Sequence, residues 1–136
     1  MSISFSGCRS RSGGLISAIA KQIKLINLKP LVKITVRFDP FYEKVSETRK
    51  FLYHISGPKV TATNISCILK TEIVCDDSSP TVTYSFESGE NIILKTSNLS
   101  TLELLKVFNR HISDHTKPSE DKEIVNSSKK EKQHKR

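Results

Sequence analysis

The chain has 136 residues, of which 36% are hydrophobic, so the sequence predicts one small domain with a modest core and polar ends. It carries 22 lysines and arginines against 14 aspartates and glutamates, which gives a formal net charge of +8 at pH 7. Cys8, Cys67 and Cys75 are too few and too scattered for a disulfide-stapled secreted domain, and we expect an intracellular protein. No stretch approaches the roughly eighteen apolar residues of a membrane span, so we expect no membrane partner.

The positive charge is concentrated at the start of the chain. Residues 1–38 contain no acidic side chain and seven basic ones: Arg9, Arg11, Lys21, Lys24, Lys29, Lys33 and Arg37. This asymmetry indicates a polyanionic partner, either an RNA or an organellar import pathway. Residues 1–13 are rich in serine and arginine, which is typical both of a mitochondrial targeting segment and of a basic flexible arm.

The first predicted elements are a helix and a strand. Residues 14–28 place apolar side chains at helical spacing with Lys21 and Lys24 off that stripe, which predicts an amphipathic basic helix. Residues 31–38 alternate between apolar and polar and predict a strand. The side chains expected to face the core are Val32, Ile34, Val36 and Phe38, and those expected to face outward are Lys33, Thr35 and Arg37.

The remaining elements follow in the order helix, strand, hairpin, helix. A helix is expected over residues 43–56, ended by Gly57-Pro58, and a strand over residues 65–74. Residues 81–86 and 91–95 predict a hairpin with a glycine in its turn. Ser100 and Glu103 form a capping box at the start of a final helix, whose apolar face runs to Ile112.

This order predicts an α/β fold with a thioredoxin-like βαβ-ββα core: a four-stranded mixed sheet with packed helices, preceded by an extra N-terminal amphipathic helix. The expected domain organisation is a basic flexible arm or targeting segment at 1–13, the basic helix at 14–28, the thioredoxin-like domain at 29–113, and a charged, disordered tail at 114–136.

No motif supports an enzyme. A redox pair of cysteines would lie in the loop after the first strand, which reads Phe38-Asp39-Pro40-Phe41-Tyr42 and contains no cysteine. Cys67 is expected to be a buried, inert thiol on a strand. His111 and His115 are spaced four apart without a third metal ligand and are expected to lie on the surface of the helix. We therefore predict no catalysis, no metal, no cofactor and no small-molecule substrate.

The seven basic residues are the candidate RNA-binding residues. If arm, helix and first strand lie together, they present one positive surface to phosphates; the alternative is separate solvated faces. Phe38, Tyr84 and Phe86 fall on predicted buried faces, which leaves no stacking platform on the sheet. Contact with the RNA backbone is therefore expected rather than reading of the bases.

An ordered series of sequence blocks runs from about Leu28 to Ser113. The blocks are Leu28-Lys29-Pro30, Val36-Arg37-Phe38-Asp39-Pro40-Phe41, Glu47-Thr48-Arg49-Lys50-Phe51-Leu52, Thr63-Asn64-Ile65-Ser66-Cys67, and Leu99-Ser100-Thr101-Leu102-Glu103-Leu104-Leu105 with Phe108 through His111-Ile112. This series resembles the family of mitochondrial ribosomal large-subunit protein number fifty-three.

The resemblance implies a non-enzymatic, thioredoxin-like subunit of the mitochondrial large ribosomal subunit, acting in mitochondrial translation and bound to ribosomes in the matrix. It implies ribosomal RNA and other mitochondrial ribosomal proteins as neighbours, toward the stalk side, and it supplies no particular RNA-binding residues. Two alternatives stay open: a thioredoxin-fold oxidoreductase, and a mitochondrial RNA-binding adaptor outside the ribosome.

Overall fold

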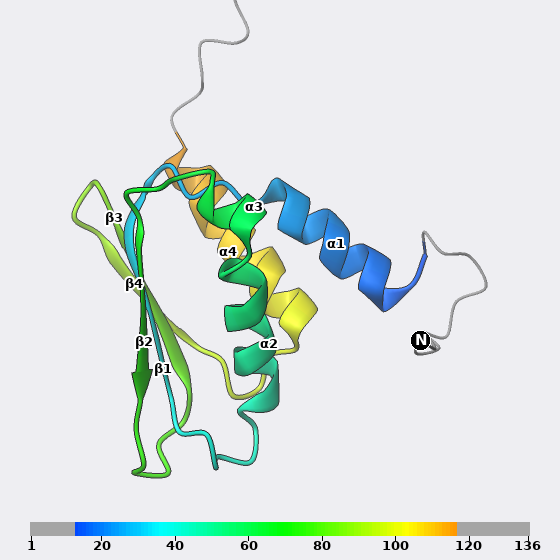
Figure 1. The fold of residues 1–136 in the computed structure, drawn as a ribbon, viewed down its shortest axis with the longest axis vertical. Helices are drawn as coiled ribbons and strands as arrows, with labels where there is room; N and C mark the ends of the chain where they lie inside the picture. The colour runs from blue at the N-terminus through cyan, green and yellow to red at the C-terminus, as the bar shows by residue number, and fades with distance from the viewer. Residues whose placement is uncertain (1–12, 117–136) are drawn as a thin grey trace, which may run out of the picture.

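The structure, a computed structural model, describes residues 13–116 (Figure 1). Its elements are α1 (Leu15–Leu25), β1 (Leu31–Phe38), α2 (Ser46–Ile55), α3 (Pro58–Thr61), β2 (Ile68–Ile73), β3 (Thr81–Phe86), β4 (Asn91–Lys95) and α4 (Thr101–His115). The predicted arm and most of the predicted tail lie outside these residues. None of the helices between residues 13 and 116 has the length and apolar character needed to cross a membrane.

The four strands form one mixed sheet in the order β2-β1-β3-β4. β1 pairs in parallel with β2 and antiparallel with β3, and β3 pairs antiparallel with β4. This confirms the predicted α/β class and the mixed four-stranded sheet. The βαβ unit followed by a ββα unit is compatible with the expected thioredoxin-like core.

The helices form a second layer on one side of the sheet. In Figure 1 the sheet is seen nearly edge-on, with α2, α3 and α4 on one side and α1 beyond them. α1 packs against α4, where the Asn109 side-chain amide donates to the Gln22 carbonyl at 3.0 Å. Between the layers, the Phe108 ring lies edge-to-face with Phe51 from α2 and Tyr84 from β3, at centroid distances of 5.6 and 5.4 Å.

The start of β1 departs from the predicted alternation. Leu31 is buried and Val32 is 45% exposed, so the prediction that Val32 faces the core is wrong. The pairing of β1 with β3 shifts register between Leu31 and Lys33. Such a bulge inserts an unpaired residue and changes which side of the sheet the preceding residues face. From Ile34 to Phe38 the predicted core face is confirmed.

β2 begins at Ile68, three residues later than expected, and Ile65 is 91% exposed. The reason is Asn64, whose side-chain amide donates to the carbonyls of Leu28 and Leu31, each at 3.0 Å. The Asn64 side-chain oxygen accepts from the backbone N–H of Ser66. An asparagine that bonds the backbone two residues on holds the chain in a turn and competes with strand pairing.

The predicted signals of the C-terminal half are confirmed. Gly89, in the turn between β3 and β4, has φ 91°, a conformation that favours glycine. Ser100 caps α4 by accepting from the backbone N–H of Glu103, and the Glu103 carboxylate accepts from the backbone N–H of Ser100 at 2.9 Å.

Candidate nucleic-acid interface

The strand register determines which side chains line the side of the sheet opposite the helices. On β1 these are Lys33, Thr35 and Arg37, and residues paired across neighbouring strands point to the same side. Thr35, for example, lies between Lys70 of β2 and Thr83 of β3. We call the surface built in this way the open sheet face; its residues are Lys33, Thr35, Arg37, Ile68, Lys70, Glu72, Thr81, Thr83, Ser85, Asn91, Ile93 and Lys95.

The open sheet face carries four cations and one carboxylate. The carboxylate is Glu72, which the Lys70 ammonium approaches to 2.8 Å. A hydrogen bond from Lys70, with the charges of Lys70, Arg37 and Lys33, lowers the pKa of Glu72 below its ordinary value. Glu72 is therefore ionised at neutral pH and offsets the charge of Lys70. The three other cations of the face, Lys33, Arg37 and Lys95, leave the open sheet face strongly positive.

The cations of this face are available to a ligand. Arg37 pairs with Asp76 at 3.3 Å, but both side chains are about half exposed. Exposed ion pairs of this kind contribute little free energy, so a phosphate can replace the carboxylate at small cost. The side chains of Lys33 and Lys95 make no hydrogen bond or ion pair with any residue between 13 and 116.

Hydroxyl groups fill the centre of the same face. Thr35, Thr81, Thr83 and Ser85 lie on the two inner strands, and each is half-buried. Hydroxyls on a flat surface donate hydrogen bonds to phosphate and sugar oxygens without distinguishing bases. The open sheet face can therefore hold a nucleic-acid backbone.

The structure separates the predicted basic residues. Lys33 and Arg37 lie on the open sheet face, and Lys29 is exposed in the loop before β1. Lys21 and Lys24 are exposed on α1, in the helix layer, so the described part of the chain does not present them on one surface with Lys33 and Arg37. Arg9 and Arg11, which the sequence also predicts as RNA-binding residues, lie outside the described residues.

Sequence reasoning missed Lys70 and Lys95. Both belong to the region after residue 38, where basic and acidic residues nearly cancel, and a count of net charge hides them. The alternation of side chains along each strand could have identified them. Lys70 points to the same side of its strand as Ile68, away from Leu69, and Lys95 points to the same side as Ile93, away from Leu94.

The loop after β1 uses Asp39 as a structural residue. Asp39 is 4% exposed, and its carboxylate accepts from the backbone N–H groups of Phe41 at 2.9 Å and Asp77 at 2.8 Å. These bonds join the β1–α2 loop to the β2–β3 loop. Cys67 is half-buried, and burial raises the pKa of its thiol, which disfavours the reactive thiolate.

The expectation that His111 and His115 are surface residues is wrong, because both pack against the sheet. His111 Nδ1 is hydrogen bonded to the Tyr84 hydroxyl, and the His115 ring lies 3.9 Å from Phe86, centroid to centroid. His115 Nε2 also lies 3.2 Å from the Glu90 carboxylate. No group of three metal-ligating side chains occurs within the described range.

The chain is a small α/β domain with a positively charged open sheet face. The family model described as 39S ribosomal protein L53/MRP-L53 matches residues 38–89, from the end of β1 to the turn after β3. This match supports the resemblance of the chain to the mitochondrial large-subunit L53 family. The description of this family is that of a ribosomal protein of the mitochondrial large subunit.

Proposed function

We propose that this chain is a structural component of the mitochondrial large ribosomal subunit in the matrix, and that its open sheet face lies on the backbone of ribosomal RNA. The observation that carries the proposal is the gathering of Lys33, Arg37, Lys70 and Lys95 on a side of the sheet that no described helix covers. A rigid positive surface of this kind attracts phosphates through a charge interaction that does not depend on base sequence.

The spacing of these cations suits a backbone rather than a single anion. Lys33 and Arg37 are four residues apart on β1, which at about 3.3 Å per residue separates their backbones by about 13 Å. This span reaches more than one phosphate of a strand. The hydroxyls between them supply additional donors, and no aromatic ring stands on the open sheet face to stack a base.

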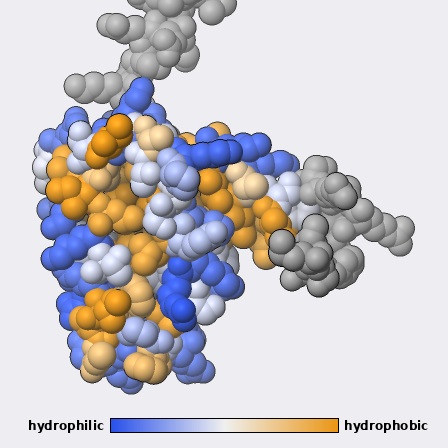
Figure 2. Space-filling model, viewed as in Figure 1, coloured by the Kyte–Doolittle hydropathy of each residue, from blue (hydrophilic) through white to orange (hydrophobic). Residues whose placement is uncertain are grey.

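Lys21 and Lys24 are proposed as contacts on the helix side. Figure 2 shows hydrophobic side chains along α1, and Leu15, Ile16 and Leu25 are each more than half exposed. Exposed apolar groups beside Lys21 and Lys24 favour a neighbouring ribosomal protein together with RNA around this helix. We propose Lys29, Arg9 and Arg11 as further RNA contacts, and a position toward the stalk side of the subunit.

The proposal is tested by charge reversal in the full chain. The double variant Lys33→Glu with Arg37→Glu should keep its circular dichroism spectrum, since neither side chain belongs to the core, and should fail to travel with large-subunit particles in a sucrose gradient. The matched control is Lys59→Glu with Lys106→Glu, which makes the same charge change at exposed positions of α3 and α4. If the Lys33→Glu, Arg37→Glu variant sediments with the particles as the control does, the proposal that the open sheet face lies on ribosomal RNA is contradicted.

The alternatives give different results in the same experiments. An adaptor outside the ribosome would leave the wild-type chain at the top of the gradient. An oxidoreductase would reduce insulin and lose that turnover on Cys67→Ser, a result that the burial of this thiol argues against.

A further inference from the structure

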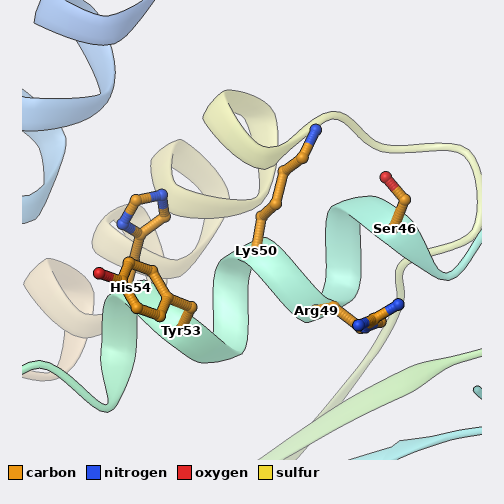
Figure 3. A pocket seen from close by; sticks show the side chains of 5 residues that line it. All are labelled: Ser46, Arg49, Lys50, Tyr53 and His54. Carbon is orange, nitrogen blue, oxygen red and sulfur yellow. The ribbon is translucent and has the colours of Figure 1, made fainter. Parts of the chain in front are cut away.

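α2 presents a second surface that the sheet and the core do not use. One side of this helix is buried through Thr48, Phe51 and Ile55. The other side lines a shallow hollow with five side chains, shown in Figure 3: Ser46, Arg49, Lys50, Tyr53 and His54. Their spacing of three and four residues places them along one side of a helix. We call this surface the α2 hollow.

The aromatic part of the α2 hollow is Tyr53, whose side chain is 75% exposed. Its ring lies 5.5 Å from the His54 ring, centroid to centroid, at an interplanar angle of 67°. Burial lowers the pKa of His54, so this imidazole is largely neutral at pH 7. One face of an exposed tyrosine ring on a rigid helix offers a platform on which a planar group can stack.

The charged part is Arg49. Its guanidinium makes no hydrogen bond or ion pair with any residue of the described range, whereas the ammonium of its neighbour Lys50 lies 2.8 Å from the Glu47 carboxylate. The second oxygen of Glu47 is occupied by the backbone N–H and hydroxyl of Thr101. The carboxylate next to the hollow is therefore already engaged, and the Arg49 guanidinium is left for a ligand.

We infer that the α2 hollow binds an unpaired RNA nucleotide, with the base stacked on Tyr53 and the phosphate held by Arg49. Residues four apart on a helix have Cβ atoms about 6 Å apart, which suits two long side chains that hold the base and the phosphate of one nucleotide. Unpaired bases splayed onto aromatic side chains, with phosphates on arginine, are the usual form of single-stranded RNA recognition. The charge of the hollow favours this ligand over a basic or neutral peptide.

The inference rests on the proposed function and adds a second RNA contact to it. The α2 hollow lies in the helix layer, whereas the open sheet face is on the opposite side of the sheet (Figure 1). The two surfaces therefore contact different RNA segments: a paired or continuous backbone on the sheet, and a looped-out nucleotide on α2. Variants of one surface leave the other intact.

The test measures binding of the full chain to two labelled RNAs, an unpaired oligonucleotide and a fully paired hairpin, by fluorescence anisotropy. Tyr53→Ala should weaken binding of the unpaired RNA about tenfold, which is within the range for loss of one stacked base, and should leave the hairpin affinity unchanged. Tyr53→Phe keeps the ring and should bind as the wild type does. Arg49→Gln should weaken binding of the unpaired RNA several-fold.

The same measurements in a Lys33→Glu, Arg37→Glu background separate the two proposals. Unpaired RNA should still bind in that background and lose affinity on Tyr53→Ala. If the hairpin binds normally there while Tyr53→Ala still weakens unpaired RNA, only the open sheet face is refuted. If Tyr53→Ala leaves the affinity for unpaired RNA unchanged in both backgrounds, the inference is overturned. A second test places a photoreactive residue at position 53 in purified large subunits. The inference is also overturned if this residue crosslinks to protein and not to ribosomal RNA.

Discussion

The hydroxyls of Thr48 and Thr96 lie 2.7 Å apart in the interior, where both side chains are fully buried. Thr96 also donates to the carbonyl of Pro80 at 3.1 Å. A hydroxyl has one proton, so Thr48 must donate to Thr96. These two hydrogen bonds connect α2 to the start of β3 and the end of β4. They lie on the buried side of α2, opposite the α2 hollow.

The two threonines should therefore respond differently to replacement by valine. Thr96→Val leaves the buried Thr48 hydroxyl without its acceptor and leaves the Pro80 carbonyl with only the backbone N–H of residue 96, so it should cost about 2–3 kcal/mol of unfolding free energy. Thr48→Val removes only one donor and should cost about 1 kcal/mol. Urea denaturation of both variants measures the difference, and equal losses would show that the proton order is wrong.

Glu47 should give the domain an acid-dependent stability. Its hydrogen bonds from Lys50 and Thr101 lower its pKa from 4.5 to about 2. A carboxyl group whose pKa is lower in the folded state than in the unfolded state stabilises the fold at any pH above the pKa of the unfolded state. The contribution of Glu47 is therefore present above pH 4.5 and is lost as the pH falls from 4.5 toward 2. The side chain is 36% exposed, so solvent screening makes the effect modest.

Thermal unfolding between pH 2 and pH 6 measures this contribution. Glu47→Gln should show a smaller fall in stability with acid than the wild type. Glu43→Gln, at an exposed position before the same helix, is the control and should follow the wild-type curve. The interpretation fails if Glu47→Gln and wild type lose stability in parallel.

The hydrogen bond between Tyr84 and His111 should contribute to the packing of α4 on the sheet. Burial raises the pKa of Tyr84, so its hydroxyl stays protonated and shares a neutral hydrogen bond with Nδ1 of His111. Tyr84→Phe should cost about 1 kcal/mol in chemical denaturation. Tyr53→Phe is the same chemical change at an exposed ring and should cost nothing measurable; equal stability of the two variants would count against the bond.

Phe108 should be among the most sensitive positions of the core. Its ring is fully buried between Phe51 and Tyr84 and joins the helix layer to the sheet. Phe108→Ala leaves a cavity and should cost about 3–5 kcal/mol. Phe41→Ala, at a ring that is 89% exposed, should leave the melting temperature unchanged. A mild effect at Phe108 would mean that the two layers are not held together at this ring.

The elements with strong local signals could be predicted from the sequence. The capping box at Ser100, the glycine turn at Gly89 and the alternation from Ile34 to Phe38 are local patterns, and each is found in the structure. Val32 and Ile65 were misplaced because a bulge and an asparagine turn depend on partners far along the chain. His111 and His115 were misplaced for the same reason, since only the fold brings Tyr84 and Phe86 beside them.

The candidate site was predicted only in part. Lys33 and Arg37 could be assigned to one face because they alternate within a single strand. Lys70 and Lys95 join them through strand pairing, which no local pattern encodes. Tyr53 and Arg49 could not be singled out, because an exposed tyrosine and arginine on the outer side of a helix have no local pattern that separates them from ordinary surface residues.

The most direct test of the account is a crosslinking measurement on purified mitochondrial large subunits that contain a photoreactive residue at position 33. If the open sheet face lies on ribosomal RNA, irradiation should attach the chain to the RNA, and a photoreactive residue at position 106, on the exposed side of α4, should give much less of this product. Crosslinks from position 33 to proteins alone, or none at all in particles that contain the chain, would contradict the account.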